Sequence, residues 1–126
     1  MEEICRIKDI YAKLYCFERS FSEKLQITIN EAMVLCYLKD KKLKSANELS
    51  EHLSLSISRV SRVIKGMESK ELIKRECGAD DKRIMLFTLT NLGYAKVASI
   101  QESGMQSFEQ FRKELCELIQ NPFIQS

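Results

Sequence analysis

The sequence predicts a mainly α-helical protein with a small β-hairpin, an α+β fold. Through most of its 126 residues, apolar side chains recur at the three-and-four spacing of amphipathic helices. Two Ser/Thr-x-x-Glu patterns, Thr28 to Glu31 and Ser45 to Glu48, are capping boxes that mark helix starts. Two short runs, LIKREC and IMLFTLT, flank a polar turn as the strands of a hairpin do.

Length and composition fit a soluble protein of one domain, or of one small domain with appended helices. With 44% hydrophobic and 30% charged residues, the chain can form a core under a charged surface. The longest apolar runs are too short to span a bilayer. The first ten residues, MEEICRIKDI, carry acids and lack the apolar region of a secretory signal. A cytoplasmic location is therefore expected.

The five cysteines do not form a recognisable chemical motif. They stand at positions 5, 16, 36, 77 and 116, with irregular spacing and no Cys-x-x-Cys pair. This pattern favours neither a disulfide framework nor a zinc site, and His52 is the single histidine. A Gly-rich phosphate loop and a Gly-x-Ser-x-Gly nucleophile motif are also missing. We therefore expect no metal, no cofactor and no enzymatic activity.

The first two helices follow from apolar spacing and capping. Apolar residues from Ile4 to Leu25 predict one long amphipathic helix. Thr28 then begins a second helix that runs through Leu38. The sequence KDKKLK, residues 39–44, predicts a basic connector after it.

The next two helices form a helix-turn-helix pattern. Ser45 begins the short helix ANELSEHL, which buries Ala46, Leu49 and Leu53. Three residues separate it from the helix ISRVSRVIKGMESK, for which Ser56 is a good N-cap. The apolar face of this second helix consists of Val60, Val63, Ile64 and Met67, and its opposite face of Ser58, Arg59, Ser61, Arg62 and Lys65. Two helices joined by a three-residue turn, the second with a Ser/Arg face, are typical of DNA-binding proteins.

The distribution of charge agrees with this pattern. The net charge of +2 is too small to decide anything by itself. From Ser56 to Arg75, however, the chain carries six basic and two acidic residues. This local excess is what a nucleic-acid footprint would show.

The hairpin and the last helices complete the chain. The tip of the predicted hairpin, residues 80–83, reads Asp-Asp-Lys-Arg. Thr90 caps a final helical region whose apolar spacing continues to Pro122. The pair Ser103-Gly104 predicts a break or kink within that region.

In this order, the motifs resemble the MarR family of bacterial winged-helix transcription regulators, from about residue 27 to residue 98. The resemblance rests on Thr28, on NELSEHLSLS around the turn, on SRVSRVIKGMESKELIKR, on Asp-Lys-Arg at residues 81–83 and on FTLTNLGYA. Each motif alone is weak, but together and at this spacing they are fairly specific. The family usually has Gly where this chain has Ser54 and Glu71, and a left-handed conformation is costlier without Gly.

The resemblance implies a division of the single domain, residues 1–126. Residues 27–90 would form the winged helix-turn-helix, with the hairpin as the wing. Residues 1–26 and 91–126 would form dimerisation helices. The apolar stripes of these terminal regions favour a second copy as their cover, giving a two-fold homodimer. The alternative is that the two regions pack only on each other within one chain.

The resemblance also gives the hairpin tip a role. In this family the wing Asp braces an Arg that reaches into the minor groove, and Asp81 and Arg83 match those positions. A narrow minor groove attracts Arg by its negative potential, and a neighbouring carboxylate can hold the guanidinium in a bidentate contact. The alternative is a plain solvated turn. The candidate DNA-binding residues are therefore Ser56, Ser58, Arg59, Ser61, Arg62, Lys65, Asp81, Lys82 and Arg83.

Together these features predict a dimeric, sequence-specific DNA-binding regulator, a repressor that a small ligand or oxidation releases from its promoter. The alternative is a winged-helix protein-interaction module that does not bind DNA, which would more often expose apolar or aromatic residues. A weaker third hypothesis is a thiol-based enzyme, which would need a polar partner near Cys16.

Effector and redox candidates also follow from the resemblance. The family often binds small aromatic acids between the dimer helices and the winged domain, and Tyr11, Tyr15, Met33 and Tyr37 would line such a cleft. Ordinary core packing explains these four residues as well. One branch of the family senses peroxides through a cysteine of the N-terminal helix, which makes Cys16 a candidate sensor. The other four cysteines are expected to be small buried hydrophobes, as free cysteines usually are.

Overall fold

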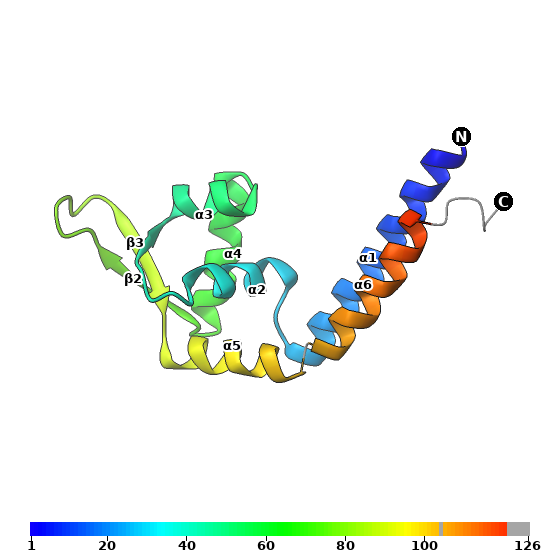
Figure 1. Ribbon diagram of the computed structural model, residues 1–126. Coiled ribbons are helices and arrows are strands. Elements are labelled where there is room, and N and C mark those ends of the chain that lie inside the picture. Colours follow the sequence, from blue (N-terminus) through cyan, green and yellow to red (C-terminus); the bar gives the residue numbers. More distant parts are fainter. Residues whose placement is uncertain (104, 121–126) are drawn as a thin grey trace. The chain divides into compact units, whose positions relative to one another are not determined.

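The computed structural model describes residues 1–103 and 105–120, which form six helices and three strands (Figure 1). The helices are α1 (Glu2–Leu25), α2 (Ile29–Leu38), α3 (Ala46–Leu53), α4 (Ile57–Ser69), α5 (Asn91–Ser103) and α6 (Met105–Gln120). The strands are β1 (Lys44–Ser45), β2 (Ile73–Cys77) and β3 (Met85–Leu89). The chain divides into two compact units, one of residues 28–99 and one that combines residues 1–27 with those from residue 100 onward.

Side-chain caps begin the helices where the sequence predicts. The Thr28 hydroxyl accepts the Glu31 N–H at 3.1 Å, and the Glu31 carboxylate accepts the Thr28 N–H at 2.9 Å. Ser45 and Glu48 form the same reciprocal pair, both bonds at 3.2 Å. Both capping boxes are therefore confirmed. The predicted break at Ser103-Gly104 falls on residue 104, which lies outside the described residues.

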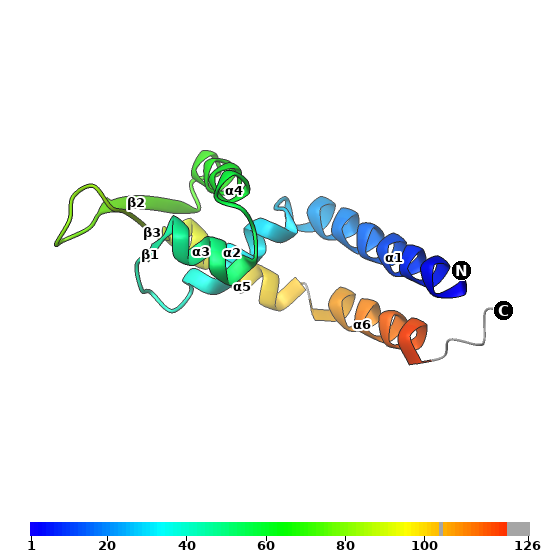
Figure 2. The ribbon, with the colours of Figure 1, turned by 90° about the horizontal axis from the view of Figure 1, so that it is seen from above.

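The sheet of the winged unit has three antiparallel strands in the order β1-β3-β2. The predicted hairpin is present as β2 and β3, with Arg75 opposite Phe87 and Cys77 opposite Met85. Its loop extends beyond the helices of this unit (Figure 2). The end of the predicted basic connector is a strand instead, because Lys44 and Ser45 pair with the outer edge of β3.

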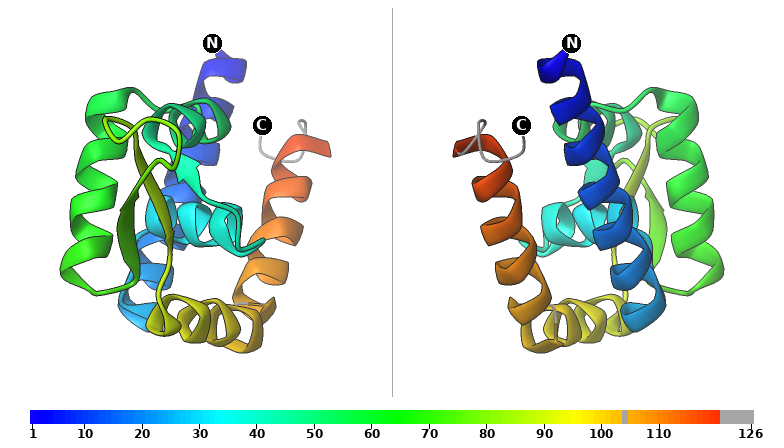
Figure 3. Two further views of the ribbon diagram at one scale, coloured as in Figure 1. Left: turned by 90° about the vertical axis from the view of Figure 1, so that its left-hand side faces the viewer. Right: turned by 90° about the vertical axis from the view of Figure 1, so that its right-hand side faces the viewer.

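Three helices and the sheet enclose one core. The fully buried side chains come from α2 (Val34, Leu35, Leu38), α3 (Leu49) and α4 (Val60, Met67). Phe87 and Leu89 of β3 close the core from the sheet side. Figure 3 shows α4 and the hairpin side by side on this unit. The predicted apolar face of α4 is confirmed, since Val60, Ile64 and Met67 are buried and Val63 is half-buried.

Two of the four described non-glycine residues with left-handed backbone, Ser54 and Glu71, stand where the resemblance places Gly. Ser54, between α3 and α4, has φ 55° and ψ 40° and donates its N–H to the Ser50 carbonyl. Glu71, between α4 and β2, has φ 59°. The Thr90 hydroxyl donates to the Glu71 carbonyl at 2.6 Å, which fixes the second turn from outside. Hydrogen bonds therefore keep both turns in the geometry that the family usually gives to Gly.

Replacing Glu71 by Gly is expected to stabilise the protein. Gly reaches positive φ without the steric penalty of a Cβ, so the free energy of unfolding should rise by roughly 0.5–1 kcal/mol. Thermal and denaturant melts measure the change. Glu76→Gly is the matched control, because Glu76 is an exposed residue of the extended strand β2 and its replacement should destabilise. A lower stability for Glu71→Gly would contradict this explanation of the turn.

The second unit contains α1 and α6, which lie side by side and run antiparallel (Figures 1 and 3). The rings of Phe17 and Phe111 stack with centroids 4.5 Å apart, and Lys13 pairs with Glu114 at 3.2 Å. The two terminal helices therefore pack on each other within one chain, as the alternative to a dimer expects. Much apolar surface stays exposed, however, including Ile4, Ile7, Tyr11, Tyr15, Phe108 and Ile119.

No helix within the described residues is long and apolar enough to cross a membrane.

Candidate nucleic-acid interface

The outward face of α4 is polar, cationic and accessible. The Ser56 hydroxyl accepts the Arg59 N–H at 3.2 Å, so Ser56 is the N-cap that the sequence predicts. The side chains of Ser58, Arg59, Ser61, Arg62 and Lys65 are exposed, while the opposite side of the helix is buried. Among residues 1–103 and 105–120, no carboxylate forms an ion pair with Arg59, Arg62 or Lys65. These three cations are therefore available to phosphates and base edges.

Two other cations of the same stretch are already paired. Arg75 makes a bidentate contact to Glu68, at 2.7 and 2.8 Å, and its guanidinium lies 5.7 Å from the Phe87 ring centroid. The hydrogen bond from Arg75 lowers the pKa of Glu68 below its usual value. Lys70 pairs with Glu31 at 2.6 Å. The charge count of the sequence thus overstates the cations available to DNA in this stretch.

Glu31 has a second role that its capping box does not reveal. Glu31 is 4% exposed, and its carboxylate accepts both the Thr28 N–H and the Lys70 ammonium through Oε1. The other oxygen lies against Gly66, where an added Cβ would come within 2.8 Å of it. One buried carboxylate therefore connects the start of α2 to the last turn of α4. Sequence spacing gives no sign of this contact, because Lys70 is 39 residues away.

The wing contains the expected ion pair. Arg83 Nε donates to Asp81 Oδ1 at 3.1 Å and Arg83 Nη2 donates to Oδ2 at 3.2 Å. The Arg83 backbone N–H also donates to Oδ1, at 3.0 Å. The side-chain hydrogen bond from Arg83 is the largest cause that lowers the pKa of Asp81 below its usual value, and the backbone hydrogen bond is the next. The Arg83 side chain is 91% exposed, so the brace orients the guanidinium without covering it.

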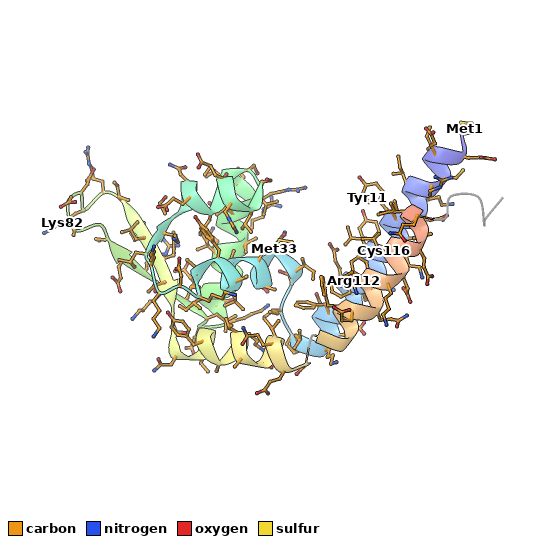
Figure 4. The ribbon with its side chains drawn as sticks, in the orientation of Figure 1. Met1, Tyr11, Met33, Lys82, Arg112 and Cys116 are labelled. Carbon is orange, nitrogen blue, oxygen red and sulfur yellow. The ribbon has the colours of Figure 1, made fainter. Side chains whose placement is uncertain are left out.

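The loop of the wing depends on a close backbone approach. Gly78 donates its N–H to the Ile84 carbonyl at 2.8 Å, and Ile84 donates to the Asp81 carbonyl at 3.1 Å. A Cβ on Gly78 would lie 2.7 Å from the Asp81 carbonyl oxygen, so only Gly fits here. Lys82 projects from the far end of this loop (Figure 4). The loop thus presents Lys82 and Arg83 next to each other on a defined backbone.

Replacing Asp81 by Ala is expected to weaken binding to operator and random DNA alike, less than Arg83→Ala does. The change frees the guanidinium but keeps its charge, so the salt dependence should stay nearly that of the parent. Because its pKa is lowered, Asp81 stays ionised and keeps its ion pair with Arg83 at every pH above the usual pKa of Asp. The ion pair is lost only in strongly acidic solution, where Asp81 takes up a proton. Binding titrations measure the effect, and Asp80→Ala is the matched control. Equal losses for both variants would show that the brace contributes nothing.

The four effector candidates belong to different units. Tyr11, labelled in Figure 4, and Tyr15 lie on α1, where both are exposed and their ring centroids are 6.4 Å apart. Met33 on α2 is 45% exposed. Tyr37, on the same helix, is half-buried and stacks on His52 with ring centroids 3.8 Å apart. His52 is exposed, and its ring packs α3 against α2.

All five cysteines are free thiols. Cys16 is exposed and lines an open groove of about 460 Å³ between α1 and α6, next to Phe17, Gln110 and Phe111. The prediction that the other four are buried is wrong for Cys5, Cys36 and Cys77, which are exposed, while Cys116 is half-buried. They occupy outward positions of helices and of β2, where sequence alone does not distinguish a cysteine from a core residue. In the described part of the chain, no three His, Cys, Asp or Glu residues gather as metal ligands would.

Known proteins share this arrangement. The model of the MarR family matches residues 27–85. The uncharacterized HTH-type transcriptional regulator YxaD of Bacillus subtilis is 40% identical over 67 residues, which are 53% of this chain and 47% of YxaD. The chain thus spans about half the length of this curated relative.

Solved structures extend the likeness beyond the winged helix. A mutant MarR from E. coli, complexed with operator DNA, has a TM-score of 0.76 at 26% identity over 90% of this chain and 84% of that one. BpsR from Bordetella bronchiseptica has a TM-score of 0.72 at 22% identity, over 86% of this chain and 75% of that one, and shows the shared fold alone. The family model, the relative and the structures agree on one assignment. The winged helix of residues 27–85 is a domain of the MarR family of transcription regulators.

Proposed function

We propose that this protein is a dimeric, sequence-specific DNA-binding transcription regulator of the cytoplasm, a repressor that acts by occupying a promoter. One observation carries the proposal: three cations that pair with no described carboxylate and two hydroxyls share the outward side of α4, whose N-terminus Ser56 caps. A recognition helix places such residues in the major groove. The similar E. coli MarR was crystallised with operator DNA, which supports the same partner here.

The two parts of the surface would divide the contacts. Arg59 and Arg62 have the length and donor geometry to bind guanine O6 and N7, with Lys65 on phosphates. Ser56, Ser58 and Ser61 would donate to phosphates or base edges. The wing, through Lys82 and Arg83, would follow the backbone and enter the minor groove. The helix would then supply sequence discrimination and the wing mainly affinity.

The alternative, a protein-interaction module, has less support. The outward face of α4 is made of charged and hydroxyl side chains, whereas partner-binding surfaces are depleted in Lys and rich in aromatic residues. The family consists of transcription regulators, and we infer that this member has no enzymatic activity of its own.

Dimerisation would involve the terminal helices. The exposed apolar side chains of α1, among them Ile4, Ile7, Tyr11 and Tyr15, form a surface that a second copy would cover. Light scattering at micromolar concentration should give twice the chain mass of 14.6 kDa. A stable monomer would contradict this part of the proposal.

Release from DNA would follow a small aromatic effector or oxidation. BpsR is regulated in its DNA binding by 6-hydroxynicotinic acid, and Tyr11, Tyr15, Met33 and Tyr37 are the candidate contacts in this chain. Cys16 is the candidate thiol, because it is exposed and lines the groove between the two helices of its unit.

Peroxide treatment is expected to weaken DNA binding by the parent protein and not by Cys16→Ser. An oxidised Cys16 would be larger and more polar, and it would disturb the packing of α1 against α6. Cys5→Ser is the matched control, because Cys5 is also exposed on α1. If Cys16→Ser loses binding with peroxide as the parent does, Cys16 is not the sensor.

Selection of bound duplexes from a random library tests the proposed function and yields the operator. A two-fold dimer should enrich an inverted repeat whose half-sites are centred about 10 bp apart, one helical turn. Library DNA that shows no enriched sequence after several rounds would contradict a sequence-specific regulator.

A further inference from the structure

One apolar residue of α4 is exposed where the helix begins. Ile57 is the first helical residue after the N-cap Ser56, and 45% of it is exposed. By spacing it continues the apolar stripe of α4, but Val60 and Met67 are 0% exposed and Ile64 is 3% exposed. Ile57 is thus the large hydrophobic residue of α4 that the core does not cover.

The residues that flank Ile57 in the sequence are polar. Its sequence neighbours, Ser56 and Ser58, are exposed, and the next residue is the exposed Arg59. The N-terminal residues of a recognition helix are the ones that approach base edges in the major groove. Among the groups that base pairs present in that groove, the C5 methyl of thymine is the apolar one.

We propose that Ile57 contacts a thymine methyl and makes one position of each half-site selective for T·A. This inference rests on the proposed DNA-binding function and adds to it a residue that reads sequence without a hydrogen bond. Covering the methyl with Ile57 removes apolar surface of both from water. A cytosine at that position would lack the methyl and would leave its N4 donor against an apolar side chain, which is unfavourable.

The test replaces each thymine of the selected operator, one at a time, by deoxyuridine, which lacks only the methyl. The parent should lose roughly fourfold in affinity at one position of each half-site, the contribution of one buried methyl. Ile57→Ala should bind the thymine and deoxyuridine duplexes equally at that position. It should keep the discrimination of the parent at every other base pair.

The variants are chosen so that misfolding does not imitate the result. Ala favours helix more than Ile, and the Ile57 side chain is only half-covered, so Ile57→Ala should fold. Its melting temperature and its binding to random DNA serve as checks. Ile84→Ala is the matched control, because Ile84 is 48% exposed on the wing, and the minor groove that a wing reaches presents no thymine methyl. Its thymine-to-deoxyuridine ratio should equal that of the parent.

Two outcomes overturn the inference while leaving the proposed function intact. In the first, the parent binds its operator but no deoxyuridine position weakens binding. In the second, Ile57→Ala keeps the full fourfold preference of the parent for thymine. The failure of the proposed function is a different result, because then no operator is enriched in the selection.

Discussion

Replacing Arg62 by Ala is expected to weaken binding to the selected operator by roughly 1–3 kcal/mol, the contribution of one bidentate contact to a base. Arg62 is exposed on the outward face of α4, and no described carboxylate pairs with it. Its donors therefore meet base edges without first breaking an ion pair. The affinity for random DNA should fall much less, so the difference in affinity between the operator and a random duplex becomes smaller.

Arg83→Ala is the comparison that separates helix from wing. The minor groove offers a degenerate code, so Arg83 should contribute affinity with little sequence information beyond A·T preference. Binding to operator and random duplexes should weaken alike, and the slope of log affinity against log salt should change by about one. Titrations of both variants at several salt concentrations measure this. If Arg83→Ala abolished discrimination and Arg62→Ala left it intact, the assigned roles would be reversed.

Gly93→Ala is expected to destabilise the protein, although Ala normally stabilises a helix. A Cβ at this position would lie 2.3 Å from the Leu72 carbonyl oxygen and 3.1 Å from the Leu89 Cβ. Backbone must therefore move, and overpacking of this kind costs about 1–3 kcal/mol. This contact explains why Gly stands at position 93 in the FTLTNLGYA motif, where the Thr90 hydroxyl also accepts the Gly93 N–H at 3.0 Å.

Gly66→Ala is the control for Gly93→Ala in a thermal melt. There the added Cβ meets a side-chain oxygen of Glu31, which can move, so the loss should be smaller. An unchanged or raised melting temperature for Gly93→Ala would show that α5 moves away from β2 at little cost. The explanation of the motif would then be wrong.

Local signals made most of the fold predictable from sequence. Thr28, Ser45 and Ser56 each bond a backbone N–H three residues ahead, so the starts of α2, α3 and α4 depend on short stretches of sequence. The outward face of α4 follows from helical periodicity. The pair of Asp81 and Arg83 spans two residues, and the family resemblance predicts it.

Contacts between distant segments were not predictable in this way. Strand β1 has two residues and exists because β3 offers it an edge, so no alternation marks it. The Arg75–Glu68 and Lys70–Glu31 pairs form only after β2 and α2 pack against α4. A count of basic residues therefore includes two that are paired within the fold, and it cannot show that Glu31 holds the last turn of α4.

The central claim is that the outward face of α4 reads DNA sequence. The ratio of two dissociation constants of the full chain tests it most directly, one for a random duplex and one for the selected operator, at the same physiological salt. Specific regulators bind their sites at least about a thousandfold more tightly than random DNA. We expect a ratio of that order for the parent and a clearly smaller one for Arg62→Ala. A parent ratio near one would contradict the account, because the cations of α4 would then bind phosphates alone.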